Sequence, residues 1–468
     1  MEFKSMGNLS QTARHISETI AVDRSNRGPL ANTPSQQENS GSSRISIAGA
    51  STAGTLARFL TRLSNIDFGP YVRFRLKCLS HSASLPAVAT LISAIAWSGH
   101  LATIPFALFA PILLYKAQSR LHTYLTLFSY YLGASWPLIP AAHAFFGAQG
   151  TIFEGILIFF SAAALLAMPA AVLFTPNRAK LPFAITGMFL LAALPPLGII
   201  GWASPLLSAG VLFPGTGWVG LIGTLALIPL LVLFPVRTVV LAAILALLAN
   251  NFYKQPAPPA GWQAINTQFG GAGQGDPDFL AEFNAHERIQ ETINKSDAHV
   301  LLFPEHVVTE WNEATEAFWR PSLTTLAERR ATLLIGVGLP RRHGPNFTVS
   351  RPYYNALIAK GYELTTVYYQ RIPVPIAMWK PFSRDSVPLN LFGPGTISVH
   401  GQRAAVLICY EQLLVWPFLS SAFERPTILI TAANDYWAKG TPIPQIQDAS
   451  ASSFARLFGM PVLSAVNE

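Results

Sequence analysis

The chain has 468 residues, enough for two or three domains, and its 12% of charged residues is about half the share usual in a soluble globular protein. The net charge of +8 comes from the first 250 residues, where it fits membrane topology better than the binding of nucleic acid. Two cysteines exclude a disulfide framework or a cysteine metal cluster, and neither a metal site nor a cofactor is expected.

The first part of the chain is polar and then basic. Residues 1–54 are rich in Ser, Asn, Gln and Gly, a composition typical of a disordered segment, which we place in the cytoplasm. Residues 55–82 mix Arg and Lys with Phe and Leu. This juxtamembrane segment is either an amphipathic stretch on an anionic membrane surface or a solvated basic face.

Residues 83–253 are almost continuously apolar and predict a membrane domain. A span needs about 20 apolar residues. The first segment is too long for one helix and is interrupted by "SGHLATIP", so we interpret it as a hairpin of two short spans, which gives about seven spans. The hydrophobic segments cover 83–115, 121–147, 151–174, 181–201, 217–236 and 238–253.

The basic residues between these segments set the predicted orientation. With a hairpin first, all of them fall on the same side as the N-terminus, which the positive-inside rule assigns to the cytoplasm. An odd number of spans then delivers the rest of the chain to the periplasmic face of a bacterial inner membrane. The residues are Lys116, Arg120, Arg178, Lys180 and Arg237.

The pattern changes after a Pro-rich linker at 254–264. Residues 265–468 alternate short apolar runs with amphipathic stretches, which is typical of an α/β domain built from parallel β-α units. Helices are expected at 278–294 and 311–328. Strands are expected at 299–305, 331–338, 354–360, 404–411 and 427–435.

Three of these strands end in reactive side chains. The run "LLFPE" ends in Glu305, "LICYE" contains Cys409 and ends in Glu411, and "ITAAND" ends in Asn434 and Asp435. Because the carboxyl ends of parallel strands meet in one crevice, we expect a thiol with a carboxylate base beside it. The alternative for Cys409 is a small buried hydrophobic residue, as we assign to Cys78.

Taken together, these motifs resemble the carbon–nitrogen hydrolase (nitrilase) superfamily, and within it the membrane-bound apolipoprotein N-acyltransferases. The motifs on which this resemblance rests are "FPE", "YYNALIAKG", "ICYE", "ANDYW" and a final helix-and-strand run ending in "VN". A more particular resemblance is to the conjugal-transfer TraB proteins of bacterial plasmids. The resemblance implies an α-β-β-α sandwich, with Cys409 as nucleophile, Glu305 as base, and Tyr410, Glu411, Asn434 and Asp435 in supporting positions.

The lysine segment of that superfamily departs from its pattern here. Aligning "YYQRIPVPIAM" on Val374 and Pro375 places Gln370 at the lysine position and Met378 at that of a supporting glutamate. Arg371 could replace the lysine only if the strand slipped by one residue, which would turn its side chain to the other face. The closing strands of the superfamily fold are not visible before Glu468, so the domain is expected to be incomplete at its C-terminus.

The resemblance implies acyl transfer, or amide or ester cleavage, through a Cys409 thioester in plasmid conjugation. Membrane lipid, with a phospholipid as acyl donor, and proteins of the conjugation apparatus are the implied partners; direct nucleic-acid binding is not expected. Because the lysine is absent, the alternative is a catalytically degenerate membrane protein with an assembly role.

Overall fold

The structure is a computed structural model, and it describes residues 84–146, 152–270, 279–341, 353–363, 366–384 and 386–468. The two segments predicted before residue 83, the disordered N-terminus and the basic juxtamembrane stretch, lie outside these residues.

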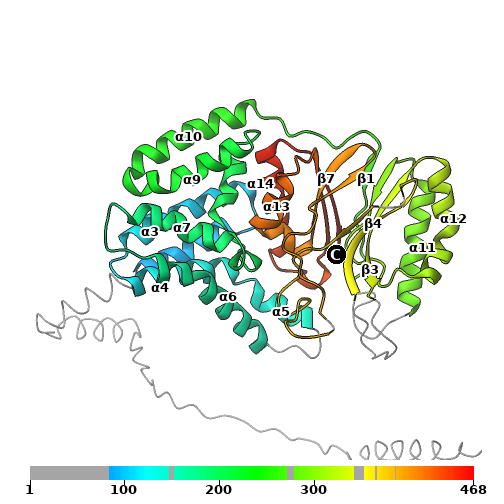
Figure 1. The fold of residues 1–468 in the computed structure, drawn as a ribbon, viewed down its shortest axis with the longest axis horizontal. Helices are drawn as coiled ribbons and strands as arrows, with labels where there is room; N and C mark the ends of the chain where they lie inside the picture. Colours follow the sequence, from blue (N-terminus) through cyan, green and yellow to red (C-terminus); the bar gives the residue numbers. More distant parts are fainter. Residues whose placement is uncertain (1–83, 147–151, 271–278, 342–352, 364–365, 385) are drawn as a thin grey trace, which may run out of the picture. The chain divides into compact units, whose positions relative to one another are not determined.

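The first half of the described chain is helical (Figure 1). It opens with the helix Ser84–Ala96 and ends with two apolar helices that are separated by a single residue, Phe234. The remaining elements are η1 (Leu101–Phe109), α3 (Ala110–Lys116), α4 (Arg120–Ser135), α5 (Leu138–Phe146), α6 (Ile152–Leu173), α7 (Leu181–Ala193), η3 (Leu197–Ile199), η4 (Pro205–Leu207), α8 (Ser208–Leu212), α9 (Trp218–Leu233) and α10 (Pro235–Phe252).

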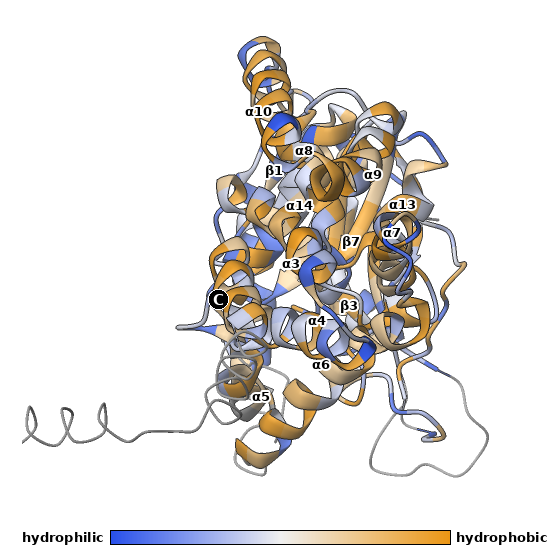
Figure 2. Cartoon of the chain, turned by 90° about the vertical axis from the view of Figure 1, so that its left-hand side faces the viewer, coloured by the Kyte–Doolittle hydropathy of each residue, from blue (hydrophilic) through white to orange (hydrophobic). Residues whose placement is uncertain are grey.

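Two of these helices, α6 and α10, are long and apolar enough to cross a membrane, and four other apolar helices are shorter. Helix α10 is mostly in the hydrophobic colour in Figure 2, and its Leu247 and Phe252 are 72% and 81% exposed. On α6 the exposed residues include Phe153 and Leu157. Apolar surface left open in this way marks contact with lipid or another protein. The count of seven spans stays a prediction.

The second half contains two mixed sheets. The first has the strand order β1-β2-β3-β4-β5, parallel from β1 to β3 and antiparallel from β3 to β5. Its elements are β1 (Trp262–Ala264), α11 (Phe279–Lys295), β2 (Val300–Leu302), α12 (Glu313–Glu328), β3 (Thr332–Pro340), β4 (Tyr353–Gly361) and β5 (Val367–Tyr369).

The second sheet has the order β6-β7-β8-β9, antiparallel between β6 and β7 and parallel from β7 to β9. Its elements are β6 (Thr396–Val399), β7 (Gln402–Ile408), η5 (Cys409–Leu413), α13 (Val415–Ala422), β8 (Ile428–Asn434), η6 (Tyr436–Ala438), α14 (Ile443–Phe458) and β9 (Val462–Asn467). The sequence analysis predicted parallel β-α units, and the antiparallel pairs in both sheets differ from that prediction.

Side chains alternate along β7, so that this strand packs against the first sheet on one face and against helices on the other. Ala404, Val406 and Ile408 pack against residues of the other sheet, whereas Ala405 and Leu407 pack against α13 and α14. Successive residues of a strand face opposite sides, so one apolar strand joins both cores. Helices α11 and α12 cover the outer face of the first sheet (Figure 1). The result is an α-β-β-α sandwich whose second helical layer also packs against the helical half.

Candidate active site

Cys409 lies directly after β7, at the first residue of η5. Its φ of +49° is in the left-handed region, which costs a residue with a side chain about 1 to 3 kcal/mol. The strand was expected to continue to Glu411; instead it ends at Ile408, and the sharp turn places the thiol at the end of the sheet. The side chain is 4% exposed.

Glu305 approaches the thiol from the other sheet, three residues after β2. Its carboxyl group contacts the Cys409 side chain, accepts a hydrogen bond from Asn355 Nδ2 at 2.5 Å and another from the backbone N–H of Asn434 at 3.0 Å. The carboxyl group is therefore held on three sides, and one of its neighbours is the sulfur.

Gln370, at the predicted lysine position, belongs to the same cluster. Its Oε1 accepts from Asn355 Nδ2 at 2.9 Å and its Nε2 donates to the Ile408 carbonyl at 3.2 Å. Both atoms of its amide are thus engaged with the protein. The neighbouring Arg371 directs its guanidinium to α13 instead.

Asn434 is the last residue of β8, and Asp435 follows it. The Asn434 carboxamide oxygen accepts from Asn467 Nδ2 at 2.7 Å, and the Asp435 N–H donates to the Asn467 carbonyl at 2.8 Å. Both residues are buried, and Asp435 lies close enough to Cys409 to raise the pKa of the thiol and close enough to Glu305 for that charge to raise its own pKa. Tyr410 contributes its backbone N–H to the sulfur, while its hydroxyl donates to the Ile199 carbonyl of the helical half at 2.9 Å.

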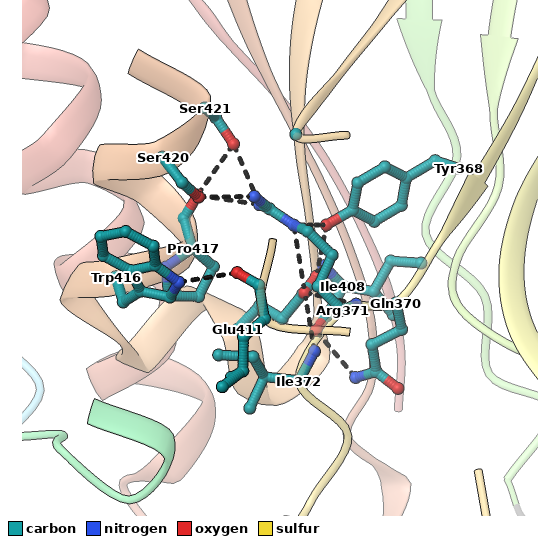
Figure 3. A network of polar contacts seen from close by, with 12 residues as sticks. Tyr368, Gln370, Arg371, Ile372, Ile408, Glu411, Trp416, Pro417, Ser420 and Ser421 are labelled. Carbon is teal, nitrogen blue, oxygen red and sulfur yellow. Dashed lines mark hydrogen bonds and ion pairs between the residues drawn. The ribbon is translucent and has the colours of Figure 1, made fainter. Parts of the chain in front are cut away.

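Glu411 holds the turn after Cys409 in place (Figure 3). Its carboxylate accepts from the N–H of Ile408 at 2.9 Å, the N–H of Arg371 at 2.8 Å and the Tyr368 hydroxyl at 2.9 Å. The Arg371 Nε lies 3.7 Å from the carboxylate. Glu411 is fully buried and faces away from the thiol, so it is a positioning residue rather than a base.

The far end of Arg371 is also fully bonded. Its guanidinium donates to the hydroxyls of Ser420 and Ser421 at 2.7 and 2.9 Å and to the Pro417 carbonyl at 2.8 Å (Figure 3). A guanidinium is always charged in a protein; burial raises the pKa of Glu411, and the Arg371 charge opposes that rise. This network joins β5, the Cys409 turn and α13.

Burial decides the protonation of the site. It raises the pKa of Glu305 to about 7 against the opposing effect of the Asn355 hydrogen bond. Burial, together with the nearby Glu305 charge, raises the pKa of Asp435 to about 8. The same two causes raise the pKa of the Cys409 thiol well above its usual value. The resting site is therefore a neutral thiol beside a carboxyl group that can accept its proton near neutral pH.

An apolar cavity of about 180 Å³ opens onto the sulfur. Cys409, Tyr410 and Gln447 line one end of it, and Ala162 and Leu165 of α6 are among the residues of the helical half that line it. Residues of both halves of the described chain line the cavity. A hydrocarbon chain is the kind of group that such a wall accommodates.

The sequence analysis did not name three residues of this cluster as site residues: Asn355, Gln447 and Asn467. Asn355 is a polar residue inside the apolar strand β4, where a buried polar group needs partners, and that was a usable signal. Gln447 lies on the buried face of α14 and is 2% exposed. Nothing in the local sequence separates it from the exposed Gln445 two residues earlier.

Relatives are found by sequence. The chain is 29% identical over 391 residues to a probable conjugal transfer protein TraB of Sinorhizobium fredii, which covers 82% of this chain and 97% of the relative. This chain resembles TraB proteins along most of its length. A TraB of Agrobacterium fabrum is also 29% identical, over 82% of this chain and 92% of its own. The predicted resemblance to the TraB group is confirmed.

The likeness to acyltransferases is partial. An apolipoprotein N-acyltransferase of Pseudomonas syringae pv. tomato is 27% identical over 217 residues, 43% of this chain and 41% of that one. No family model matches the chain.

Solved structures show a weaker likeness. A carbon–nitrogen hydrolase of Helicobacter pylori gives a TM-score of 0.27 at 13% identity, over 36% of this chain and 58% of its own. A nitrilase-superfamily amidase of Nesterenkonia gives 0.25 at 13% identity, over 37% and 63%. Both scores are low.

Proposed function

We propose that this chain is a membrane-bound acyltransferase that acts through a thioester on Cys409, in the service of plasmid conjugation. One observation carries the proposal: the thiol contacts a buried carboxyl group and also opens into an apolar cavity. The first contact supplies a base, and the second supplies a place for an acyl chain. The similarity to TraB proteins supports the conjugative setting.

The first half-reaction takes an acyl group from an ester, with a membrane phospholipid as the proposed donor. The thiol proton moves to Glu305 while the sulfur attacks the ester carbonyl carbon, and a C–S bond forms. The tetrahedral oxyanion then collapses, the C–O bond to the alcohol breaks, and Glu305 gives its proton to the leaving alkoxide. A base with a pKa of about 7 can make both transfers.

The second half-reaction empties the site. An amine, a hydroxyl group or water attacks the thioester carbon and gives its proton to Glu305. The C–S bond breaks, and the sulfur takes the proton back to regenerate the thiol. The product is an amide, an ester or a free acid, according to the acceptor.

Mass spectrometry of the purified protein tests this proposal directly. After incubation with phospholipid or a long-chain activated ester, the wild type should carry one acyl adduct on the peptide that contains Cys409, and Cys409→Ser should carry none. Cys78→Ser is the matched control, because it leaves Cys409 as the sole thiol. An unmodified Cys409 in protein that is folded and inserted would favour the non-catalytic assembly role instead.

We also propose an inner-membrane location with residues 254–468 in the periplasm. The basic loops at the helix ends support it, because two of them are joined: Arg178 donates to the Tyr115 carbonyl, and Arg120 donates to the Ala171 carbonyl at 2.7 Å. These contacts gather Arg120 and Arg178 at one end of the helices, which the positive-inside rule assigns to the cytoplasm.

A reporter enzyme that is active only in the periplasm, fused after Trp262, tests the orientation. We expect an active periplasmic reporter and an inactive cytoplasmic one at the same position. The reverse result would contradict the odd number of spans, and the hairpin in the first apolar segment with it.

A further inference from the structure

Two glutamine amides lie near the nucleophile, and they differ in what they face. Gln370 is bonded at both amide atoms, to Asn355 and to the Ile408 carbonyl. Gln447, from α14, is among the residues that line the cavity, and the end of its amide lies 3.9 Å from the Cys409 sulfur. It is also 2% exposed. Only Gln447, of the two, presents an amide to the space in which an acyl group would react.

We propose that Gln447, held by Asp435, donates the side-chain hydrogen bond to the oxyanion that forms on Cys409. The inference rests on the proposed function. The oxyanion sits on the carbon that is bonded to sulfur, so a donor must lie within a few ångströms of the sulfur on its cavity side. The backbone N–H of Tyr410, which already contacts the sulfur, is the second donor. The pair replaces the missing lysine.

The Gln447 amide has two orientations, and Asp435 selects between them. With nitrogen toward Asp435, it donates to both carboxylate oxygens, at 2.8 and 3.0 Å, and its oxygen faces Cys409. In the opposite orientation its nitrogen faces the sulfur. Its oxygen then faces Asp435, and it can accept a hydrogen bond there only when the Asp435 carboxyl group is protonated. A neutral Asp435 therefore sets the donor toward the oxyanion, and an ionised Asp435 sets an acceptor there.

The groups around Asp435 keep it neutral over a useful range. Glu305, Glu468 and Cys409 are the titratable groups that act on it. Burial and the charge of Glu305 raise the pKa of Asp435 to about 8, and burial raises the pKa of Glu305 to about 7. Near neutral pH the two carboxyl groups then share one negative charge, a coupled titration. Acylation requires that this charge reside on Glu305, the base.

Substitution of the amide is the first test. With a p-nitrophenyl ester of a long-chain acid, Gln447→Met should form the acyl-enzyme about 100- to 1,000-fold more slowly than wild type, the usual loss for one oxyanion donor. Gln445→Met, an exposed position on the same helix, should match wild type. A wild-type rate in Gln447→Met would overturn the inference. If the wild type itself forms no acyl-enzyme, the proposed function fails as well, so the two failures are distinguishable.

The pH profile is the second test and does not depend on how well Gln447→Met folds. The wild-type acylation rate should fall above about pH 8, as Asp435 ionises. Asp435→Asn imitates the neutral acid, since its amide can donate to Gln447, and its acylation rate should lose this alkaline fall. A wild-type alkaline limb in Asp435→Asn would overturn the proposal.

Discussion

The two sides of Cys409 are built from different chemistry. On one side, Glu305, Asn355 and Gln370 form a buried polar cluster at the first sheet, which Gln370 joins to the second sheet through the Ile408 carbonyl. On the other side, the cavity wall is almost wholly apolar and includes α6 of the helical half. The polar side belongs entirely to the α/β domain. The apolar side exists only because that domain packs against helices.

This difference separates reactivity from substrate choice. A carboxyl group that makes three contacts in a buried site is held in one geometry, and that geometry activates the thiol. Contacts with an apolar wall do not depend on direction in this way, so the wall selects acyl groups by their size and hydrocarbon content. Changes on the polar side should therefore alter the rate for every acyl donor, whereas changes on the apolar side should alter which donor is preferred.

Glu305→Gln is expected to have the largest effect. The amide keeps the shape of the side chain but cannot accept the thiol proton, and a general base typically contributes 100- to 10,000-fold. Acyl-enzyme formation, measured by quenched-flow mass spectrometry, should fall by that order for short and long donors alike. A loss confined to long donors would contradict the separation of the two sides.

Arg371→Met should have the next largest effect, on stability. It removes a buried cation and leaves Glu411 charged without its partner, which typically costs about 3 to 5 kcal/mol. The free energy of unfolding in detergent should fall by that order. Arg371→Met combined with Glu411→Gln should recover part of the loss because no charge is then left unpaired. A double variant no more stable than the single one would contradict an ion pair as the cause.

The strands that carry the polar side could be predicted because their sequences are locally distinctive. Each is a short apolar run that ends in a reactive residue, and the structure brings Glu305, Cys409 and Asp435 together as their order implied. The antiparallel pairs were not predicted, since strand direction depends on loops rather than on apolar pattern. The end of β7 was placed three residues too late because Tyr410 and Glu411 have side chains compatible with a strand.

The apolar side could not be predicted at all. Ala162 and Leu165 read as ordinary residues of a hydrophobic helix, and nothing in "FSAAALLAM" indicates that they face a site more than 240 residues away in the sequence. The same holds for Gln447, whose part depends on the Asp435 carboxyl group beside it. Packing between distant segments created these contacts, and single-sequence patterns do not encode it.

The pH dependence of the free energy of unfolding measures the burial of Glu305 separately from catalysis, and the expected effect is smaller. Because the pKa of Glu305 rises on folding from 4.5 to about 7, the folded protein binds the proton more tightly than the unfolded chain. The stability gained from this is complete below pH 4.5 and is lost as pH rises through about 7. Between pH 5 and 8 the wild type should thus lose roughly 3 kcal/mol more than Glu305→Gln. Parallel curves would show that Glu305 is not desolvated.

Filling the cavity should produce the smallest effect and the one most specific to the apolar side. Ala162→Phe places a ring in the wall without touching any polar atom of the cluster, so it shortens the space for an acyl chain and leaves the base in position. Each methylene that no longer fits forfeits about 0.8 kcal/mol. The preference for a dodecanoyl over a butanoyl ester should therefore fall about 10-fold or more, while the rate with the butanoyl ester stays near wild type. Val172→Phe, at a position of α6 that is 65% exposed, is the control and should change neither rate. If Ala162→Phe slowed both esters equally, the cavity would not hold the acyl chain, and the apolar side would have to be assigned to packing alone.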